Sequence, residues 1–494
     1  MSKRNRKRRT YFPIDSIVGG LKLDVPPQTI NPANCPDCKN VMFLDGIVRQ
    51  SYGAGFYAGT KAAALSGTIM LLPYVVDELI CHTTSKFYNY NTGTEVFDLI
   101  TTSAPAALTF TGDIDDAWSW GILNDLYVYS NGLDQIRMWT PGAGTSDALT
   151  NVTNYRAKWL NIYGGRLCMY NVKDGATWNP QNIRWSVVGD PTDITGAGSG
   201  YQDLGEVLKT SDDIMRAEKS GDYAVIYAEN CIATQQYTGE VDTPFAFILN
   251  IPDAGLAARR ALASVDRGAR HIFLAEDNIY AYTCCGFGLD PIGDPVKADL
   301  FSEINRTYMS RSFAVHYPAR EIVRFHIPTG DSAVPDTYYE LNIKDNTWAR
   351  GERAFTGAGY RTDSPILLYG DASGYVYEDS SDYDNVGSVY YMDAWWETKD
   401  FTVGERNTSS FVRWMEIRFQ GQGDTVTVYY SVDEGSTWTS VKAVTLASAW
   451  DTYKADLDVV SQKIRFRFRN QANDETFAMR WLEVGFLDVG EVRS

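Results

Sequence analysis

Residues 127–132 are Tyr127-Val128-Tyr129-Ser130-Asn131-Gly132, a short aromatic strand that ends in an Asn-Gly turn. Alternation of side chains with a period of two, followed by Asn-Gly, is typical of a β-hairpin. Similar short strands with Gly, Asn or Asp turns recur at residues 88–93, 342–348 and 370–377. Units that return every ~40–50 residues indicate a propeller or a repeat array. We therefore predict an all-β fold.

About seven modules of this kind follow one another along the chain. They cover residues 68–100, 117–140, 155–195, 207–247, 262–300, 311–350 and 355–385. A propeller leaves only short, protected strand edges, so it can hold many strands in one closed unit. We predict a β-propeller of about seven blades at residues 41–387, with one short helix at Gly255–Ala263.

The pattern changes after Gly387 to longer alternating strands. Residues 464–469 place Ile464, Phe466 and Phe468 on one face of a strand and three arginines on the other. Strands with one apolar face and one solvent-exposed face predict a C-terminal antiparallel β-sandwich at residues 388–494. The arginines are Arg465, Arg467 and Arg469. They are a possible interaction strip, and the alternative is a solvated face paired with nearby acids.

The N-terminus is strongly basic, whereas the whole chain carries a net charge of −17. The basic side chains are Lys3, Arg4, Arg6, Lys7, Arg8 and Arg9. An acidic body should repel nucleic acid, while a basic segment should seek phosphate or an acidic protein surface. We predict that residues 1–12 form an arm that binds a partner or DNA; a solvated tail is the alternative. Residues 13–40 are rich in proline and predict an extended lead-in.

Membrane insertion by this chain is not expected. The most apolar run, Ile69–Ile80, contains Pro73, Asp77 and Glu78 and is shorter than the ~20 residues of a membrane helix. No apolar segment follows the basic N-terminus, as a secretory signal would require. We expect synthesis in a reducing cytoplasm.

Neither the cysteines nor the histidines predict a metal site. The pair Cys35 and Cys38 lacks a second ligand pair at zinc-binding spacing. The adjacent Cys284 and Cys285 would form a disulfide only under strain. We expect structural thiols, with no metal and no cofactor.

Residues 431–438 match the pattern Ser-x-Asp-x-Gly-x-Thr-Trp, which is known in sialidases as the Asp box. The matching residues are Ser431, Asp433, Gly435, Thr437 and Trp438. The aspartate can accept N–H groups of a turn, and glycine supplies a positive φ. Because the motif occurs once and lies outside the predicted blades, we interpret it as a structural turn.

No pattern of catalytic residues is apparent in the sequence. Acidic clusters at Asp113, Asp115 and Asp116 and at Asp212-Asp213 lie among turn-forming residues, where aspartate usually caps turns. A nucleophile elbow and a phosphate-binding loop are absent from the sequence. We therefore predict that the protein is not an enzyme.

Several segments, taken in order, resemble one protein family. They are residues 19–27, Asn40-Val41, residues 45–49, Tyr52-Gly53, residues 164–167, residues 183–186, residues 189–191, residues 237–239 and Pro244-Phe245. This order is similar to that of the β-propeller tail-hub, or packaged-DNA stabilisation, proteins of short-tailed double-stranded DNA bacteriophages. Related head–tail connector and nozzle proteins share the pattern.

The resemblance implies a structural protein of the virion, located in the phage tail. Such proteins form a ring, usually six-fold, beneath the portal and its adaptor ring, beside other tail proteins. The ring retains packaged double-stranded DNA and forms part of its ejection conduit, without sequence-specific contact. The alternative is a carbohydrate-binding or glycan-cleaving propeller that acts in host-receptor recognition.

Overall fold

The computed structural model describes residues 9–57, 64–103, 108–380, 392–403, 408–421, 424–471 and 476–491. Within these ranges the protein is all-β, as predicted, and most strands form antiparallel sheets. The α-helices in the described part are α1 (Gly205–Leu208) and α2 (Lys297–Glu303). Short 3₁₀ turns lie at Thr150–Val152, Asp266–Gly268, Arg306–Arg311 and Pro318–Arg320. Neither α-helix is long and apolar enough to cross a membrane.

Seven antiparallel sheets, here sheets 1 to 7, follow one another along the chain. Sheet 1 contains β8 (Ile69–Leu71), β9 (Tyr74–Val75), β10 (Glu78–Thr83), β11 (Phe87–Asn91) and β12 (Val96–Leu99). Sheet 2 contains β13 (Ser119–Leu123), β14 (Leu126–Ser130), β15 (Arg137–Trp139) and β16 (Ser146–Ala148). Sheet 3 contains β17 (Tyr155–Tyr163), β18 (Arg166–Asp174), β19 (Thr177–Trp185) and β20 (Gly200–Asp203).

The remaining four sheets are antiparallel as well; sheet 5 has three strands, and the other three sheets have four strands each. Sheet 4 contains β21 (Ile214–Ser220), β22 (Tyr223–Ala228), β23 (Ile232–Tyr237) and β24 (Phe245–Ile251). Sheet 5 contains β25 (Leu262–Val265), β26 (Arg270–Leu274) and β27 (Ile279–Thr283). Sheet 6 contains β28 (Phe313–Tyr317), β29 (Ile322–Ile327), β30 (Thr337–Asn342) and β31 (Thr347–Glu352). Sheet 7 contains β32 (Gly357–Arg361), β33 (Ile366–Gly370), β34 (Val376–Ser380) and β7 (Gly53–Phe56).

Sheet 7 joins the two ends of this series. Its outer strand β7 precedes sheet 1 in the sequence, yet it pairs with β34 so that Phe56 lies opposite Tyr377. The rings of these two residues lie 5.0 Å apart. An early strand therefore completes the last sheet.

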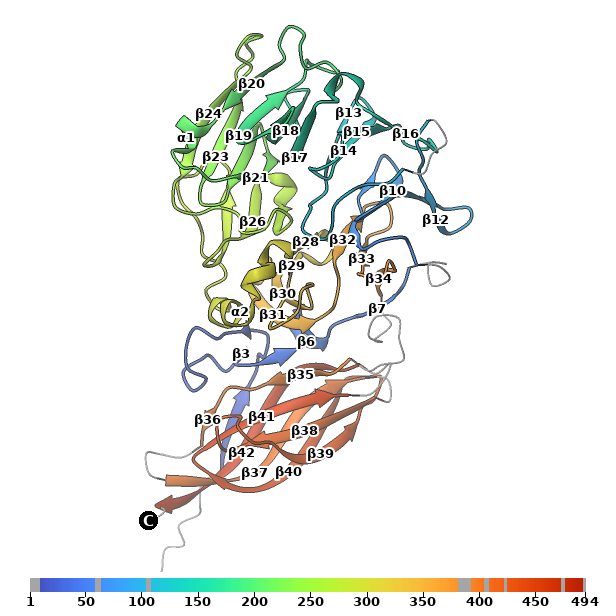
Figure 1. Ribbon diagram of the computed structural model, residues 1–494. Coiled ribbons are helices and arrows are strands. Elements are labelled where there is room, and N and C mark those ends of the chain that lie inside the picture. Colours follow the sequence, from blue (N-terminus) through green and yellow to red (C-terminus); the bar gives the residue numbers. More distant parts are fainter. Residues whose placement is uncertain are drawn as a thin grey trace, which may run out of the picture.

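Two larger sheets lie below the seven in Figure 1. One is ordered β40 (Asp451–Ser461), β37 (Thr408–Gln420), β42 (Ala478–Glu491), β6 (Ile47–Gln50) and β5 (Val41–Leu44), and β1 (Arg9–Ile14) also pairs with β42. The other is ordered β39 (Thr439–Thr445), β38 (Thr425–Ser431), β41 (Lys463–Asn470), β35 (Ala394–Glu397) and β4 (Cys38–Lys39), and β36 (Phe401–Thr402) pairs with β41. A short parallel pair links β2 (Gly20–Leu21) and β3 (Asn34–Cys35).

N-terminal segments therefore complete sheets built mainly from the C-terminal part. Strands β5 and β6 lie within the range predicted for the propeller but pair with each other and, through β6, with β42. One hydrophobic core includes Trp348 of sheet 6 together with Trp396 and Phe466 of the C-terminal strands. This continuous core fixes the upper and lower parts of Figure 1 to each other.

The helix predicted at Gly255–Ala263 is wrong. This segment is irregular until β25 begins at Leu262. A Cβ atom on Gly255 would lie only 2.1 Å from the carbonyl oxygen of Ala228, so its backbone packs directly against the end of β22. Tertiary packing therefore overrides the local pattern.

Candidate functional site: a central pocket

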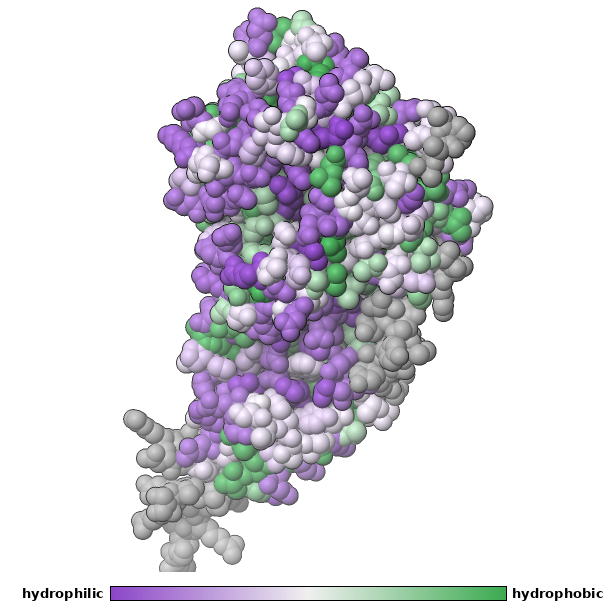
Figure 2. Space-filling model, in the orientation of Figure 1, coloured by the Kyte–Doolittle hydropathy of each residue, from purple (hydrophilic) through white to green (hydrophobic). Residues whose placement is uncertain are grey.

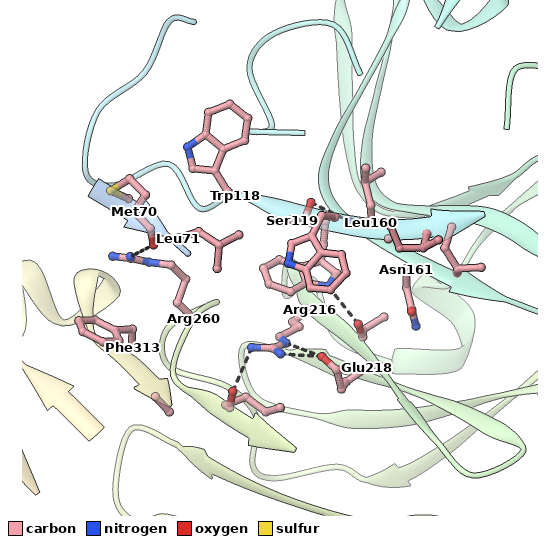
Figure 3. A pocket seen from close by; sticks show the side chains of 18 of the residues that line it. Met70, Leu71, Trp118, Ser119, Leu160, Asn161, Arg216, Glu218, Arg260 and Phe313 are labelled. Carbon is pink, nitrogen blue, oxygen red and sulfur yellow. Dashed lines mark hydrogen bonds and ion pairs between the residues drawn. The ribbon is translucent and has the colours of Figure 1, made fainter. Parts of the chain in front are cut away.

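A pocket of about 350 Å³ lies where the seven sheets converge. Each sheet contributes one edge strand to its lining, namely β8, β13, β17, β21, β25, β28 and β32. Figure 3 shows side chains from several of these strands around the hollow. The pocket therefore exists only when all seven sheets are in place.

Small residues allow these strands to approach closely. A Cβ atom on Gly121 of β13 would lie 2.5 Å from Cγ1 of Ile162 on β17. Ala217, Ala314 and Ala358 also line the pocket with minimal side chains. The space that remains between the strands is lined by larger side chains, which are aliphatic, aromatic and charged.

Three tryptophans line the pocket: Trp118 and Trp120 pack in one hydrophobic cluster, and Trp159 packs in another. Two of them are fixed by hydrogen bonds: Trp118 donates to the carbonyl of Thr83 at 3.1 Å, and Trp159 donates to the carbonyl of Ala217 at 3.0 Å. The third, Trp120, is half-buried, and its ring stacks on buried Tyr127 with centroids 5.6 Å apart.

An ion pair also lines the pocket, and its hydrogen bonds are drawn as dashed lines between Arg216 and Glu218 in Figure 3. Arg216 donates from Nε and Nη2 to the same carboxylate oxygen of Glu218, at 3.1 and 2.6 Å. Nη1 of Arg216 donates to the carbonyl of Leu262 at 3.1 Å, and its guanidinium lies 4.8 Å from the ring of Trp159. Arg216 is therefore held from three sides, and one oxygen of Glu218, Oε1, accepts no hydrogen bond from the described residues.

Arg260 is the second cation at the pocket, and it is buried. Its guanidinium donates to three backbone carbonyls: those of Met70 at 3.2 Å, Thr356 at 2.7 Å and Arg311 at 3.1 Å. Burial lowers its pKa to about 10. Within the described ranges it forms no ion pair: three carbonyl dipoles face its charge, and Asp115, which is hydrogen-bonded to Arg311, compensates that charge only from a distance.

The pocket lining therefore carries one net positive charge. Its charged members are Arg216, Glu218 and Arg260. Arg216 and Glu218 neutralise each other, which leaves the charge of Arg260. This local sign is opposite to that of the whole chain, whose net charge is −17.

The predicted arm is largely beyond what the structure describes. Lys3, Arg4, Arg6, Lys7 and Arg8 lie outside the described residues. Arg9 begins β1, whose backbone pairs with β42 from Arg9 opposite Leu487 to Ile14 opposite Leu482. Residues 9–12 of the predicted arm thus belong to a strand of the same chain.

The predicted interaction strip is engaged within the chain. Arg465 donates from Nε and Nη2 to both oxygens of Asp400, each at 2.8 Å, and is buried. Arg467 donates from Nε to Glu397 at 2.7 Å, and Arg469 forms a two-fold contact with Asp393 at 2.8 Å. Nearby acids therefore neutralise all three arginines.

The predicted structural turn forms a closed hydrogen-bond network. Asp433 accepts the backbone N–H of Thr437 at 2.9 Å and its hydroxyl at 2.6 Å, while Ser431 donates to Asp433 at 2.7 Å. These hydrogen bonds, led by that of the Thr437 hydroxyl, lower the pKa of Asp433 to about 2. Gly435 has a φ of +91°, and the ring of Trp438 lies 4.2 Å from the guanidinium of Arg467.

The cysteines are free thiols. Cys35 and Cys38 are buried, and burial raises the pKa of Cys35 well above its usual value. The sulfur atoms of Cys284 and Cys285 lie 3.0 Å apart. No group of three or more His, Cys, Asp or Glu in the described part of the chain could hold a metal ion.

The acidic clusters weighed for catalysis are occupied by structural contacts. Asp115 forms two hydrogen bonds with Arg311, at 2.6 and 2.7 Å, and these lower its pKa. Asp113 and Asp116 accept backbone N–H groups within their own turn. Asp212 accepts from Asn230 at 3.1 Å, and Asp213 accepts from Asn171 at 3.3 Å.

Sequence reasoning did not find the central pocket. Its lining comes from seven segments spread between residues 70 and 358, so no local motif marks it. The run Trp118-Ser119-Trp120-Gly121 is a usable signal, because it combines two tryptophans with a glycine at the start of a module.

No protein-family model and no curated protein matches this chain. Among solved structures, it is similar to the crystal structure of the computationally designed Ika8 protein. The two chains are 11% identical, the match covers 73% of this chain and 99% of that chain, and the TM-score is 0.37.

Proposed function

We propose that this chain is a β-propeller of seven blades followed by a β-sandwich, and that it functions as a structural ring protein of a phage virion. Two features support the propeller. The edge strands of seven consecutive sheets line one pocket, and an early strand, β7, completes the last sheet. Closure of the first and last blades by such a strand removes exposed sheet edges at the junction.

The sandwich is supported by the two larger sheets, which share one core. Val412 and Met415 of β37 lie in the same buried cluster as Val428 of β38 and Phe468 of β41. Strands that contribute alternate side chains to a common core are typical of two sheets packed face to face.

The observation that carries the functional proposal is the distribution of charge. A chain with a net charge of −17 places six basic side chains within residues 3–9. In a conduit, an acidic wall lets DNA slide because it does not hold phosphates, while the basic segment suits an acidic neighbouring protein or DNA. The segments whose order along the chain resembles that of tail-hub proteins also favour this division between an acidic body and a basic N-terminal segment.

The conduit would lie between subunits and not along the propeller axis. The centre of the seven sheets is a pocket of about 350 Å³ walled by tryptophans, which leaves no passage for a duplex. A conduit therefore requires several copies, and a hexameric ring stacked on the portal or adaptor ring and on other tail proteins fits the family resemblance. Neither a catalytic step nor a membrane is needed for this role.

Lateral contacts of such a ring can use the outer strands of the blades. Exposed apolar side chains occur on β12, with Val96 at 41% and Leu99 at 39% exposure, and on β20 and β24, with Tyr201 at 66% and Ile248 at 48%. Figure 2 shows a largely hydrophilic face on which apolar residues are scattered. Sheet edges with apolar side chains can pair across an interface, and obligate ring contacts usually exceed about 2,000 Å².

Imaging of phage particles that contain this chain tests the proposal. We expect a closed ring of copies around the DNA axis in the tail or at the head–tail junction. Particles with one or two isolated copies, or with this chain only at the tips of receptor-binding fibres, would contradict it.

A deletion tests the role of the basic segment. Removal of Met1–Arg8 leaves β1 and its pairing with β42 in place, so thermal stability should stay unchanged while incorporation into particles falls. Replacement of the five basic residues of this segment, Lys3, Arg4, Arg6, Lys7 and Arg8, by glutamine is the matched variant of full length. Normal incorporation of both variants would show that the basic segment does not dock the protein.

A further inference from the structure

The central pocket has the size and composition of a binding site for a small molecule. Ligand pockets usually measure about 300–1,000 Å³ and combine apolar walls with a few polar groups. At about 350 Å³ this pocket lies at the lower end of that range, which suits one ring-sized group. Its location within one chain makes it independent of ring assembly.

The indole of Trp120 provides a flat apolar surface at the pocket. One face of the Trp120 ring is covered by Tyr127, and the indole is half-buried at the pocket lining. A pyranose ring presents a face of C–H groups that can pack on an indole. Its stack on buried Tyr127 holds the Trp120 ring in place, so this surface is preorganised for such contact.

The pair of Arg216 and Glu218 provides polar groups in the lining of the same pocket. The guanidinium and the carboxylate are planar and oriented by their mutual hydrogen bonds. Glu218 keeps one oxygen without a donor from the described residues, and this oxygen can accept hydrogen bonds from ligand hydroxyls. A donor-rich ring such as a sugar matches this arrangement.

The charge of the pocket selects among sugars. Arg260 contributes one positive charge, which Asp115 compensates only in part because that carboxylate is hydrogen-bonded to Arg311. A single ligand carboxylate would bring the summed charge of lining and ligand to zero, whereas a phosphate with nearly two charges would leave an excess negative charge beside Glu218. The match is therefore with a monoanion.

From these features we infer that the central pocket binds one acidic sugar residue of the hexuronate type, stacked on Trp120 and hydrogen-bonded to the Arg216–Glu218 pair. The residue is supplied either as a free monosaccharide or as the end of an acidic polysaccharide. This binding goes beyond the proposed role in a ring and requires no bond to be made or broken.

Titration calorimetry of the purified chain with D-glucuronate tests the inference, with D-glucose, inorganic phosphate and uridine monophosphate as comparison ligands. We expect saturable binding of glucuronate, and tighter binding of glucuronate than of glucose, phosphate or the nucleotide. A tri-galacturonate probe distinguishes the two sources, since stronger binding than that of the monosaccharide indicates a polysaccharide end. No saturation by glucuronate at about 10 mM, a range that detects affinities as weak as millimolar, would overturn the inference, as would tighter binding of phosphate or the nucleotide.

Two variants link the binding to the named side chains. Trp120→Ala should weaken glucuronate binding about tenfold or more through loss of the stacking surface. Trp178→Ala, which removes a tryptophan outside the pocket lining, should leave binding unchanged. Glu218→Gln keeps the shape but removes a negative charge, so the preference for glucuronate over glucose should rise several-fold. An unchanged preference in folded Glu218→Gln protein, or unchanged affinity in folded Trp120→Ala protein, would contradict the assignment.

Discussion

Replacement of Arg260 by methionine should be among the most damaging single changes in the chain. The guanidinium of Arg260 lies just before sheet 5 and donates to carbonyls of Met70 in sheet 1, of Arg311 before sheet 6 and of Thr356 before sheet 7. One side chain thus connects four of the seven sheets at the point where the series closes. Methionine fills similar space but offers no donor.

The expected loss of stability follows from the three backbone carbonyls that the substitution leaves without a donor. Hydrogen bonds that involve a charged partner each contribute about 1.5–3 kcal/mol, and three carbonyls would lose theirs. Part of this loss is offset because a buried guanidinium is costly to desolvate, as the lowering of its pKa to about 10 indicates. Each buried carbonyl left without a donor costs about 1–3 kcal/mol, so three of them, less the desolvation that is saved, give an expected loss of about 3–5 kcal/mol.

Urea unfolding, followed by tryptophan fluorescence, measures this loss. Hydrogen exchange of β8 and β32 adds a local readout, because these strands should open first when the connection is removed. Arg267→Met is the matched control: Arg267 is exposed in the 3₁₀ turn after β25, and its loss should change stability by less than about 0.5 kcal/mol. If Arg260→Met unfolds within about 1 kcal/mol of the wild type, then water satisfies the three carbonyls and Arg260 does not hold the sheets together.

Two further predictions concern buried positions near the inner strands. Burial lowers the pKa of His326 well below 6.5, so below pH 6.5 the unfolded chain binds a proton that the folded chain does not. The protein should therefore become less stable as the pH falls below 6.5, and this group should lower the free energy of unfolding by about 2 kcal/mol at pH 5. His326→Phe should remove that part of the difference between urea midpoints at pH 7 and pH 5; an unchanged difference would show that the imidazole becomes protonated in place. Gly359→Ala would place a Cβ atom 1.6 Å from the carbonyl oxygen of Leu72, so we expect a loss of about 3 kcal/mol or more. Gly144→Ala, with open space around it, should be neutral, and equal melting temperatures of the two variants would refute the clash.

Local turn chemistry made part of the fold predictable. Gly164 and Gly165 both have positive φ, 58° and 70°, and connect β17 to β18 as a two-residue hairpin turn. The turn at Asn131-Gly132 differs, because a longer connection follows before β15 begins at Arg137. Asn131 accepts N–H groups of its own loop there, which explains why the residue types predict a turn but not its length.

Long-range pairing was not predictable from these local signals. The strand β7 pairs with a strand more than 300 residues further along the chain, and β6 pairs with β42 across a greater separation. Such pairs depend on which edges remain open after the intervening sheets have formed, and no local pattern encodes this. The central pocket is hidden for the same reason, since each sheet contributes only a few of its residues.

The arginines of β41 show that an alternating pattern predicts the two faces of a strand but not whether the charged face is exposed. Alternation correctly separates Phe466 and Phe468, which are buried in the core, from Arg465 and Arg467 on the other face. The sequence alone presents that other face as a basic surface. In the fold, Glu397 at the end of β35 lies beside both arginines and, together with Asp400, compensates their charge, although these acids are about 65–70 residues away in the sequence. A charged stripe in a strand therefore indicates an exposed face only when no neighbouring element supplies the opposite charge. The same reasoning applies in reverse to Arg260, which forms no ion pair in the described chain because the carboxylate that acts on it, Asp115, is bound to Arg311.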